Sequence, residues 1–295
     1  MGATRLGDVA DQVKKFWSPL FMDELKETTL LPSLVNKDYD GQIMREGDTV
    51  YVSQLNRPNA ERKQTGAGSD SFSSQKMSTS RISIQANQRI TASYEVEDLV
   101  DIQSQLNQAN PAIRRALLEA VEIELNNYLY SLVSPSTSAP DHSVDSVSDL
   151  NKAAMVANRI LAGQAKWRQD GGWWALLDPS YHGDVLSDNT LSSREYAPED
   201  APVVGGQLAQ KRFGFNILED TSAGLLSLSP AAAGADCGLF FHPDFMHLVM
   251  QKEPTFKVSD LHSNKQHGYL ISVDIILGAS LGIDGNIKHI VNYNS

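Results

Sequence analysis

The chain has 295 residues, of which 41% are hydrophobic, and its formal net charge is −11. No stretch approaches the roughly 20 apolar residues that span a bilayer, and the N-terminus lacks the apolar segment of a secretion signal. The Lys and Arg residues are scattered, which argues against specific DNA or RNA binding because phosphate recognition needs clustered basic side chains.

Residues 1–35 predict two short amphipathic helices. Asp8 can cap the first, and Ser18 can cap the second with Pro19 at its first helical position. Apolar residues such as Leu20 and Leu25 give the second helix an apolar stripe. An arm with so much apolar surface needs another surface to lie against.

The next section predicts a long β-hairpin whose distal half has almost no core residues. Val50 and Val52 alternate with polar residues, and alternation returns from Ile82 onward. Residues 55–80 between them are nearly free of apolar side chains. A two-stranded ribbon alone is marginally stable in water. A projection of about 30 residues that cannot bury itself is expected to be disordered, to cover a ligand, or to lie on another subunit.

Asn110-Pro111 opens the clearest helix of the sequence, which continues through residue 133. A helix of about 23 residues extends roughly 35 Å at 1.5 Å per residue. The Ser- and Pro-rich segment 134–140 ends it and predicts a linker. The apolar positions, spaced by three or four residues, are Ile113, Leu117, Leu118, Val121, Leu125, Tyr128, Leu129 and Leu132.

The rest of the chain predicts a mixed α/β unit in which two buried strands each run into an X-Pro pair and a short helix. This repeated pattern suggests two similar units in one sheet. The expected elements are a helix from 148 to 161, strands at 173–177, 213–217 and 238–241, helices after Asp178-Pro179 and over Pro243–Met250, and extended segments around 256–261, 269–275 and 287–291.

One pattern points to catalysis. Gly278-Ala279-Ser280-Leu281-Gly282 matches the G-x-S-x-G sequence of serine hydrolases. In that topology the acid and the histidine follow on later strands, whereas Asp284 and His289 lie too close to Gly282 in the sequence. A strand that runs into a glycine-rich bend explains the pattern better.

Motifs for metals and cofactors are incomplete. None of the seven histidines forms H-x-x-x-H or H-E-x-x-H, and the single cysteine, Cys237, excludes an intrachain disulfide. Gly66-Ala67-Gly68 lacks the Lys-Ser/Thr of a phosphate loop, and the segment from Asp38 lacks the glycine of a calcium loop. We therefore expect no enzyme, and no catalytic, cofactor-binding or metal-binding residue.

The order of these parts resembles the major capsid proteins of tailed phages, which have the Hong Kong 97-type fold. The local likeness is Leu34-Val35-Asn36-Lys37-Asp38-Tyr39-Asp40-Gly41 followed by Gly47-Asp48-Thr49-Val50. It is similar to the "VN-x-D-Y-x-G … GDTV" that leads from the N-terminal arm into the extended loop in many such proteins. Phe16-Trp17-Ser18-Pro19 also looks like the arm helix of that group. Elsewhere the resemblance is architectural and covers nearly the whole length.

The resemblance implies an α+β chain with five sections. They are an N-terminal arm at 1–45, an extended loop at 46–90, a peripheral domain at 91–144 with a spine helix at 111–133, an axial domain at 145–255, and strands at 256–295 that return to the peripheral and axial domains.

The implied function is a major capsid protein that assembles through pentamers and hexamers into an icosahedral shell around double-stranded phage DNA. Its main partner is then itself, with scaffolding, portal and decoration proteins as further candidates. Packaged DNA is near it only non-specifically, and no membrane is involved. We expect the protein in the virion after assembly in the host cytoplasm.

Two properties of some relatives do not carry over. Some cross-link a loop lysine to an asparagine of a neighbour; Lys63 and Lys76 lie in the loop and Asn286 and Asn292 lie late, but their spacing does not identify a pair. Some carry a long cleaved scaffolding segment, for which the expected arm leaves no room. A separate scaffolding protein, or assembly without one, is expected.

Two alternatives stay open. A bacterial encapsulin nanocompartment has the same fold but loads enzyme cargo instead of DNA, and neighbouring genes for a terminase and portal or for a cargo enzyme distinguish the two. A hydrolase that uses Ser280 is the other alternative, which labelling with a serine-reactive phosphonate tests.

Overall fold

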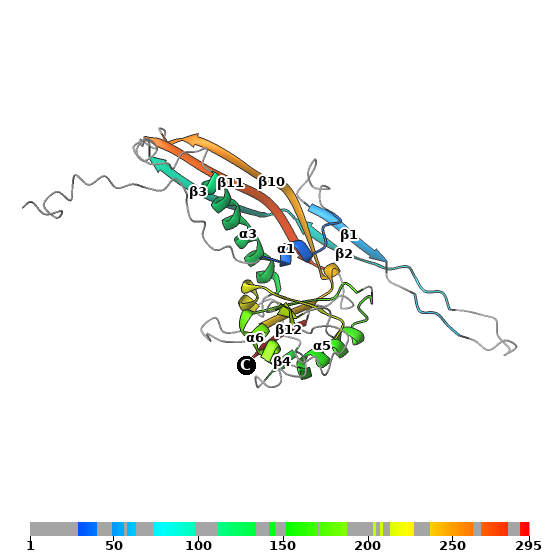
Figure 1. The fold of residues 1–295 in the computed structure, drawn as a ribbon. Coiled ribbons are helices and arrows are strands. Elements are labelled where there is room, and N and C mark those ends of the chain that lie inside the picture. Colours follow the sequence, from blue (N-terminus) through cyan, green and yellow to red (C-terminus); the bar gives the residue numbers. More distant parts are fainter. Residues whose placement is uncertain are drawn as a thin grey trace, which may run out of the picture.

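The computed structural model describes residues 29–39, 49–55, 58–62, 73–97, 111–133, 142–144, 152–169, 171–187, 203–204, 207–208, 213–226, 237–261, 267–282 and 290–294. The expected helices within 1–28 lie outside these residues, as do Lys63, Asp284, Asn286 and His289. The described elements form a long sheet with a helix on it, a projecting hairpin, and a second unit built on another sheet (Figure 1).

The long sheet has three antiparallel strands in the order β10-β11-β3, and helix α3 lies along one face (Figure 1). The helix runs Pro111–Val133, the bounds that the apolar periodicity predicted. Every second residue of β11 from Ile271 to Leu277 shares one buried core with α3 residues such as Leu117 and Leu125. The strands are β3 (Gln88–Glu97), β10 (Met246–Asp260) and β11 (Gly268–Leu281).

The expected helix over Pro243–Met250 is wrong. Only one turn, η4 (Pro243–Phe245), is helical, and β10 starts at Met246. The apolar run that includes Leu248 and Val249 suits a buried strand as well as a helix, so periodicity alone could not separate the two. This segment is a strand because its pairing with β11 continues from Met246 to Asp260. The idea of two similar strand–helix units is therefore wrong as well.

A cluster of charges ties the three strands of the long sheet together. The register of β10 shifts on both sides of Lys252, a stretch that also accommodates Pro254. Here Asp274 of β11 accepts hydrogen bonds from Lys252 and Thr255 of β10 and from Arg89 of β3. These bonds, above all that from Lys252, lower the pKa of Asp274 to about 2. The aspartate therefore stays ionised over the whole range of ordinary pH.

The expected hairpin is present. Strands β1 (Thr49–Leu55) and β2 (Thr79–Gln85) pair antiparallel from Thr49–Gln85 to Leu55–Thr79 and project away from the rest of the molecule (Figure 1). Only the base has a core, in which Ile84 is fully buried with Val249 of β10. The ribbon beyond this base buries no side chain among the described residues, as its polar sequence predicted.

The hairpin base crosses β11 at a glycine. A Cβ on Gly278 would lie 2.0 Å from the carbonyl oxygen of Gln85, much closer than any real contact. The end of β2 can approach β11 only because residue 278 has no side chain. Gly282 has the same role where the chain passes η4, since a Cβ there would lie 2.8 Å from the Asp244 carbonyl oxygen.

The second unit is a five-stranded mixed sheet in the order β4-β12-β9-β5-β8. Helices α5 (Lys152–Gln164) and α6 (Pro179–Ser187) accompany it, and a small pair is formed by β6 (Val203–Val204) and β7 (Gln207–Leu208). The sheet strands are β4 (His142–Val144), β5 (Trp174–Leu177), β8 (Asn216–Glu219), β9 (Cys237–Phe241) and β12 (Ile290–Asn294).

Most expected elements of this unit are confirmed, with bounds that differ by a few residues, as in α5, which continues to Gln164. The strand expected at 213–217 begins at Asn216, because Phe213 and Gly214 form a turn with φ values of 51° and 90°. Gly214 adopts this left-handed conformation at little cost. The aromatic core around Trp167, Trp173 and Phe215 then closes beneath α5.

The two sheets divide the chain differently from the sections expected from the sequence. Strand β10 lies wholly in the long sheet, so it crosses the expected boundary between 255 and 256. Strand β4 falls within the expected peripheral section 91–144 but pairs in the five-stranded sheet with β12. Each sheet is thus completed by chain segments that lie far apart in the sequence.

We expect Gly278→Ala to destabilise the chain by about 1–3 kcal/mol, because the added methyl group forces the end of β2 away from β11. Urea unfolding of the monomeric protein measures this. Gly183→Ala is the matched control, since a Cβ at that helical glycine meets nothing within 4 Å. Equal unfolding free energies for the two variants would contradict the crossing.

Candidate interaction surfaces

The segment that carries the capsid-like motif is held against the start of β10. After the short helix α1 (Leu31–Leu34), the N–H of Asn36 donates to the Met246 carbonyl, 3.1 Å away, and the Leu248 N–H donates back to the Asn36 carbonyl at 3.0 Å. This is a parallel bridge between Asn36 and His247. The chain that leaves the expected arm is therefore tied to the backbone of the long sheet.

Side chains of the same motif reinforce this attachment. The Asn36 amide Nδ2 donates to both Asp38 and Asp244 at 3.0 Å, and the Asp38 N–H donates to the Asn36 Oδ1 at 2.7 Å. The Tyr39 ring meets the His247 ring edge to face, with centroids 5.3 Å apart. This attachment, which we call the Asn36 clamp, consists of Asn36, Asp38 and Tyr39. All three belong to the motif that resembles those of capsid proteins.

A second polar junction lies at the buried carboxylate of Asp220, between β8 and the 3-10 turn η3 (Thr221–Leu226). It accepts hydrogen bonds from the Leu30 N–H at 3.3 Å, the Ser222 N–H at 2.9 Å and the Asn126 amide at 3.4 Å. The arm segment, helix α3 and the second unit therefore meet at one side chain. No pattern in the sequence indicates this role of Asp220.

The charge state of Asp220 is set by opposing effects. Burial raises its pKa, while the hydrogen bonds from Ser222 and Leu30 lower it, and burial has the larger effect. The neighbouring Tyr130 hydroxyl has a pKa well above its usual value because of burial and the negative charge of Asp220. The junction thus holds an ionisable group in a site that disfavours its charged form.

Ser280 lacks the context of a hydrolase nucleophile. It lies inside β11, paired with His247 of β10, and the strand continues to Leu281 instead of turning sharply into a helix. Its hydroxyl donates to the Leu281 carbonyl, and the buried Nδ1 of His247 has no hydrogen-bond partner. Gly278 and Gly282, the two glycines of the motif, lie where another backbone segment passes too close for a side chain. Packing therefore explains the G-x-S-x-G pattern.

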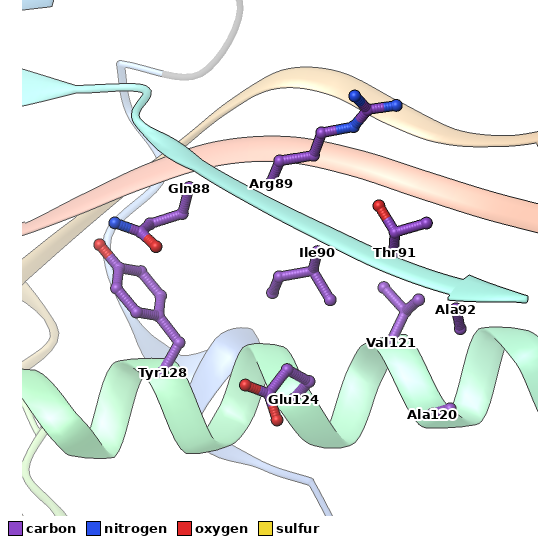
Figure 2. Close-up of a pocket in the computed structure, with 9 residues that line it drawn as sticks. All are labelled: Gln88, Arg89, Ile90, Thr91, Ala92, Ala120, Val121, Glu124 and Tyr128. Carbon is purple, nitrogen blue, oxygen red and sulfur yellow. The ribbon is translucent and has the colours of Figure 1, made fainter.

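A groove of about 500 Å³ runs between β3 and α3 (Figure 2). Its polar groups include Arg89, which is paired with Asp274, and Glu124, and its apolar floor includes Ile90 and Val121. These side chains include no nucleophile paired with a base. Strand β3 is also the end of its sheet among the described strands, and such an open edge can accept another strand.

The large exposed apolar side chains among the described residues belong to three parts of the structure. Tyr51, Leu55 and Met77 lie on the hairpin; Tyr94 and Val258 flank Ile271 on the long sheet; the remainder belong to the second unit. The sequence indicated the hairpin but not the second unit, because periodicity identifies a helix without saying which side stays uncovered. In the second unit these side chains are Val156, Ile160 and Leu225.

The described residues contain no group of three or more His, Cys, Asp or Glu side chains placed to hold a metal ion. None of the described helices is both long and apolar enough to cross a membrane. The absence of catalytic and cofactor-binding residues stays a prediction.

Comparisons with known proteins identify the fold. No family model and no curated protein matches the sequence. Among solved structures, a Mycobacterium phage Che8 chain matches with a TM-score of 0.75 at 17% identity, covering 95% of this chain and 96% of that one. The Cyanophage Pam1 capsid matches with a TM-score of 0.73 at 12% identity, covering 97% of both chains. The chain has a phage capsid fold.

Other matches agree with this assignment. The capsid structure of the Cyanophage P-SCSP1u gives a TM-score of 0.70 at 11% identity, and covers 97% of this chain and 94% of that chain. The capsid fold therefore includes both sheets and the hairpin, with little sequence in common. The α+β class and the resemblance inferred from the sequence are confirmed at the level of fold.

The buried Asp220 should make stability depend on pH. Because its pKa is raised on folding, the folded chain binds more protons than the unfolded chain between the two pKa values. We therefore expect the wild type to gain stability, relative to Asp220→Asn, as the pH falls from 7.5 toward 4.5. Urea unfolding of both proteins across this range measures the difference. If the stability of the wild type relative to Asp220→Asn stays constant or falls on acidification, burial does not control this carboxylate.

Proposed function

We propose that this chain is the major capsid protein of a tailed phage, which assembles through pentamers and hexamers into an icosahedral shell around double-stranded DNA. The observation that carries the proposal is the match in fold to phage capsid chains over at least 95% of this chain. These matching structures come from phages, which favours a genome shell over an encapsulin nanocompartment. Assembly in the host cytoplasm and a place in the virion follow from this role.

In such a shell, each section of the chain corresponds to one part of the capsid subunit. Residues 1–45 act as an arm, 46–90 as an extended loop, and the sheet with the spine helix 111–133 as the peripheral domain. The five-stranded sheet with α5 and α6 is the axial domain, and the strands of 256–295 complete both domains. The clamp at Asn36 fixes where the arm leaves the peripheral domain.

The hairpin supports the idea that one subunit lies on another. Tyr51 and Leu55 are on the same face of the ribbon, since residues two and four apart in a strand share a face, and they are 63% and 58% exposed. The Arg81 guanidinium lies over the Tyr51 ring, 5.2 Å from its centroid. Met77, which is 81% exposed, follows in the adjoining segment. We assign these side chains to contact with a neighbouring subunit.

The same role accounts for the charge of the chain. A net charge of −11 disfavours adhesion to packaged DNA, so the protein contains the genome without gripping it. The open edge of β3 and the groove beside it are further surfaces for contact between copies. Scaffolding, portal and decoration proteins are the other partners that such a shell requires or accepts.

Size-exclusion chromatography with negative-stain microscopy tests the proposed function directly. We expect the purified chain to elute as pentamers, hexamers or hollow shells. A compact monomer at all concentrations and salt conditions would overturn the proposal.

Deleting residues 60–78 tests the loop. The deletion leaves four residues between the ends of β1 and β2, which is enough for a hairpin turn. We expect a soluble, folded subunit whose core at Ile84 is intact. Its yield of shells should fall by about tenfold or more, because the loss of a contact worth about 1.4 kcal/mol lowers the association constant tenfold.

A chain in which 60–78 is replaced by a Gly/Ser segment of equal length is the control for loop length. It should fail like the deletion, since it lacks Met77 and the other side chains of the loop itself. Normal shells from either variant would refute the role of the loop.

A further inference from the structure

Helix α5 is apolar on two opposite sides. Its inner side buries Ala154, Met155 and Ala162 in the core of the second unit. On its outer side Val156 and Ile160, one turn apart, are 38% and 54% exposed. An outer helix of a free domain normally presents charged side chains there. A helix that is apolar on both sides is expected to be covered on both sides.

The outer side carries no carboxylate, and Gln164, one turn after Ile160, is an exposed polar side chain on it. The Arg159 guanidinium is held over the Trp173 ring, 4.1 Å from its centroid. Asn158 is fully buried. No Asp or Glu occurs anywhere in Lys152–Gln164, although the chain as a whole has a net charge of −11. Copies of such an acidic chain repel one another, so a surface without carboxylates is where two copies can approach at least cost.

The second unit also exposes an apolar side chain on the side opposite α5. A ring of five or six identical subunits needs heterologous contacts, in which two different surfaces meet. Leu225 of η3 is 49% exposed and is the other large exposed apolar side chain described in this unit. Figure 1 shows α5 on the side toward which the hairpin projects, and η3, in yellow, on the opposite side beneath α3.

We infer that the outer face of α5, centred on Val156 and Ile160, packs against Leu225 and η3 of the next copy in the ring. The inference rests on the proposed shell function and specifies its contact between axial units. The hairpin and α5 then reach the same neighbour, one from each sheet of the subunit. The apolar contact at α5 stabilises an interface between two copies, whereas the negative charges elsewhere on the two acidic surfaces repel each other.

Ile160→Glu is the first test. The side chain is half-exposed, so the unfolding temperature of the free subunit should stay within a few degrees of wild type. A carboxylate in an apolar contact should raise the protein concentration needed for assembly by about tenfold or more. Ser180→Glu, on an exposed position in the first turn of α6, adds the same charge to the same unit and should assemble normally.

Cross-linking identifies the partner surface. The native Cys237 is fully buried, so engineered cysteines dominate the reaction. In assembled protein, the double variant Ile160→Cys/Leu225→Cys treated with a short bis-maleimide should give a ladder of species up to pentamer and hexamer. Each single variant should stay mostly monomeric on a denaturing gel.

The outcomes separate this contact from the function. Normal assembly of Ile160→Glu, or shells of the double variant without a ladder, would overturn the contact and leave the capsid function standing. Cross-linked dimers of the single variant Ile160→Cys would show that α5 of one copy contacts α5 of another. That result would also overturn the proposed contact between α5 and η3. A wild-type chain that never forms oligomers would overturn both.

Discussion

The antiparallel ladder between β10 and β11 is the part on which the other described elements depend. Helix α3 packs on one face of it, the arm segment pairs with its start at His247, and the hairpin base rests on it at Val249 and Gly278. None of these attachments is local in sequence. A chain that holds a projecting hairpin in a fixed direction needs such a rigid platform, and a long ladder that is buried on one face supplies it.

Two polar junctions hold the arm segment in different ways. At the Asn36 clamp, one neutral amide bridges two carboxylates through two bonds of 3.0 Å, one exposed and one part-buried. At Asp220 a buried carboxylate is satisfied only by uncharged donors, which leaves part of its desolvation penalty uncompensated. The clamp is therefore a fixed attachment, whereas the Asp220 junction is sensitive to the protonation of a single group.

The sequence predicted elements wherever the apolar period was long and regular. Helix α3 has the expected bounds because its stripe repeats over six turns, and the hairpin was found because Val50 and Val52 alternate. The start of β10 was missed because a short apolar run fits two kinds of structure, and only β11 resolves it. The segment at Gly278 matches a catalytic pattern, but the short chain after Gly282 already favoured a glycine-rich bend, and the structure adds the physical reason, a close backbone approach. Asp220 and the outer side of α5 depend on three-dimensional neighbours, so no sequence pattern could indicate them.

The open edge of β3 has a consequence for the free subunit. Among the described strands, β3 leaves an edge of ten residues without a partner, and such an edge is a template for any extended chain, including misfolded copies of itself. Acidic residues at its far end, Glu95 and Glu97, act as gatekeepers that slow such stacking. At the near end the charged residue is Arg89, which is paired with Asp274, and Ile90 and Ala92 lie over the groove. The pool of free subunits is thus exposed to aggregation for as long as this edge stays uncovered, which favours rapid incorporation into larger assemblies over a long-lived monomer.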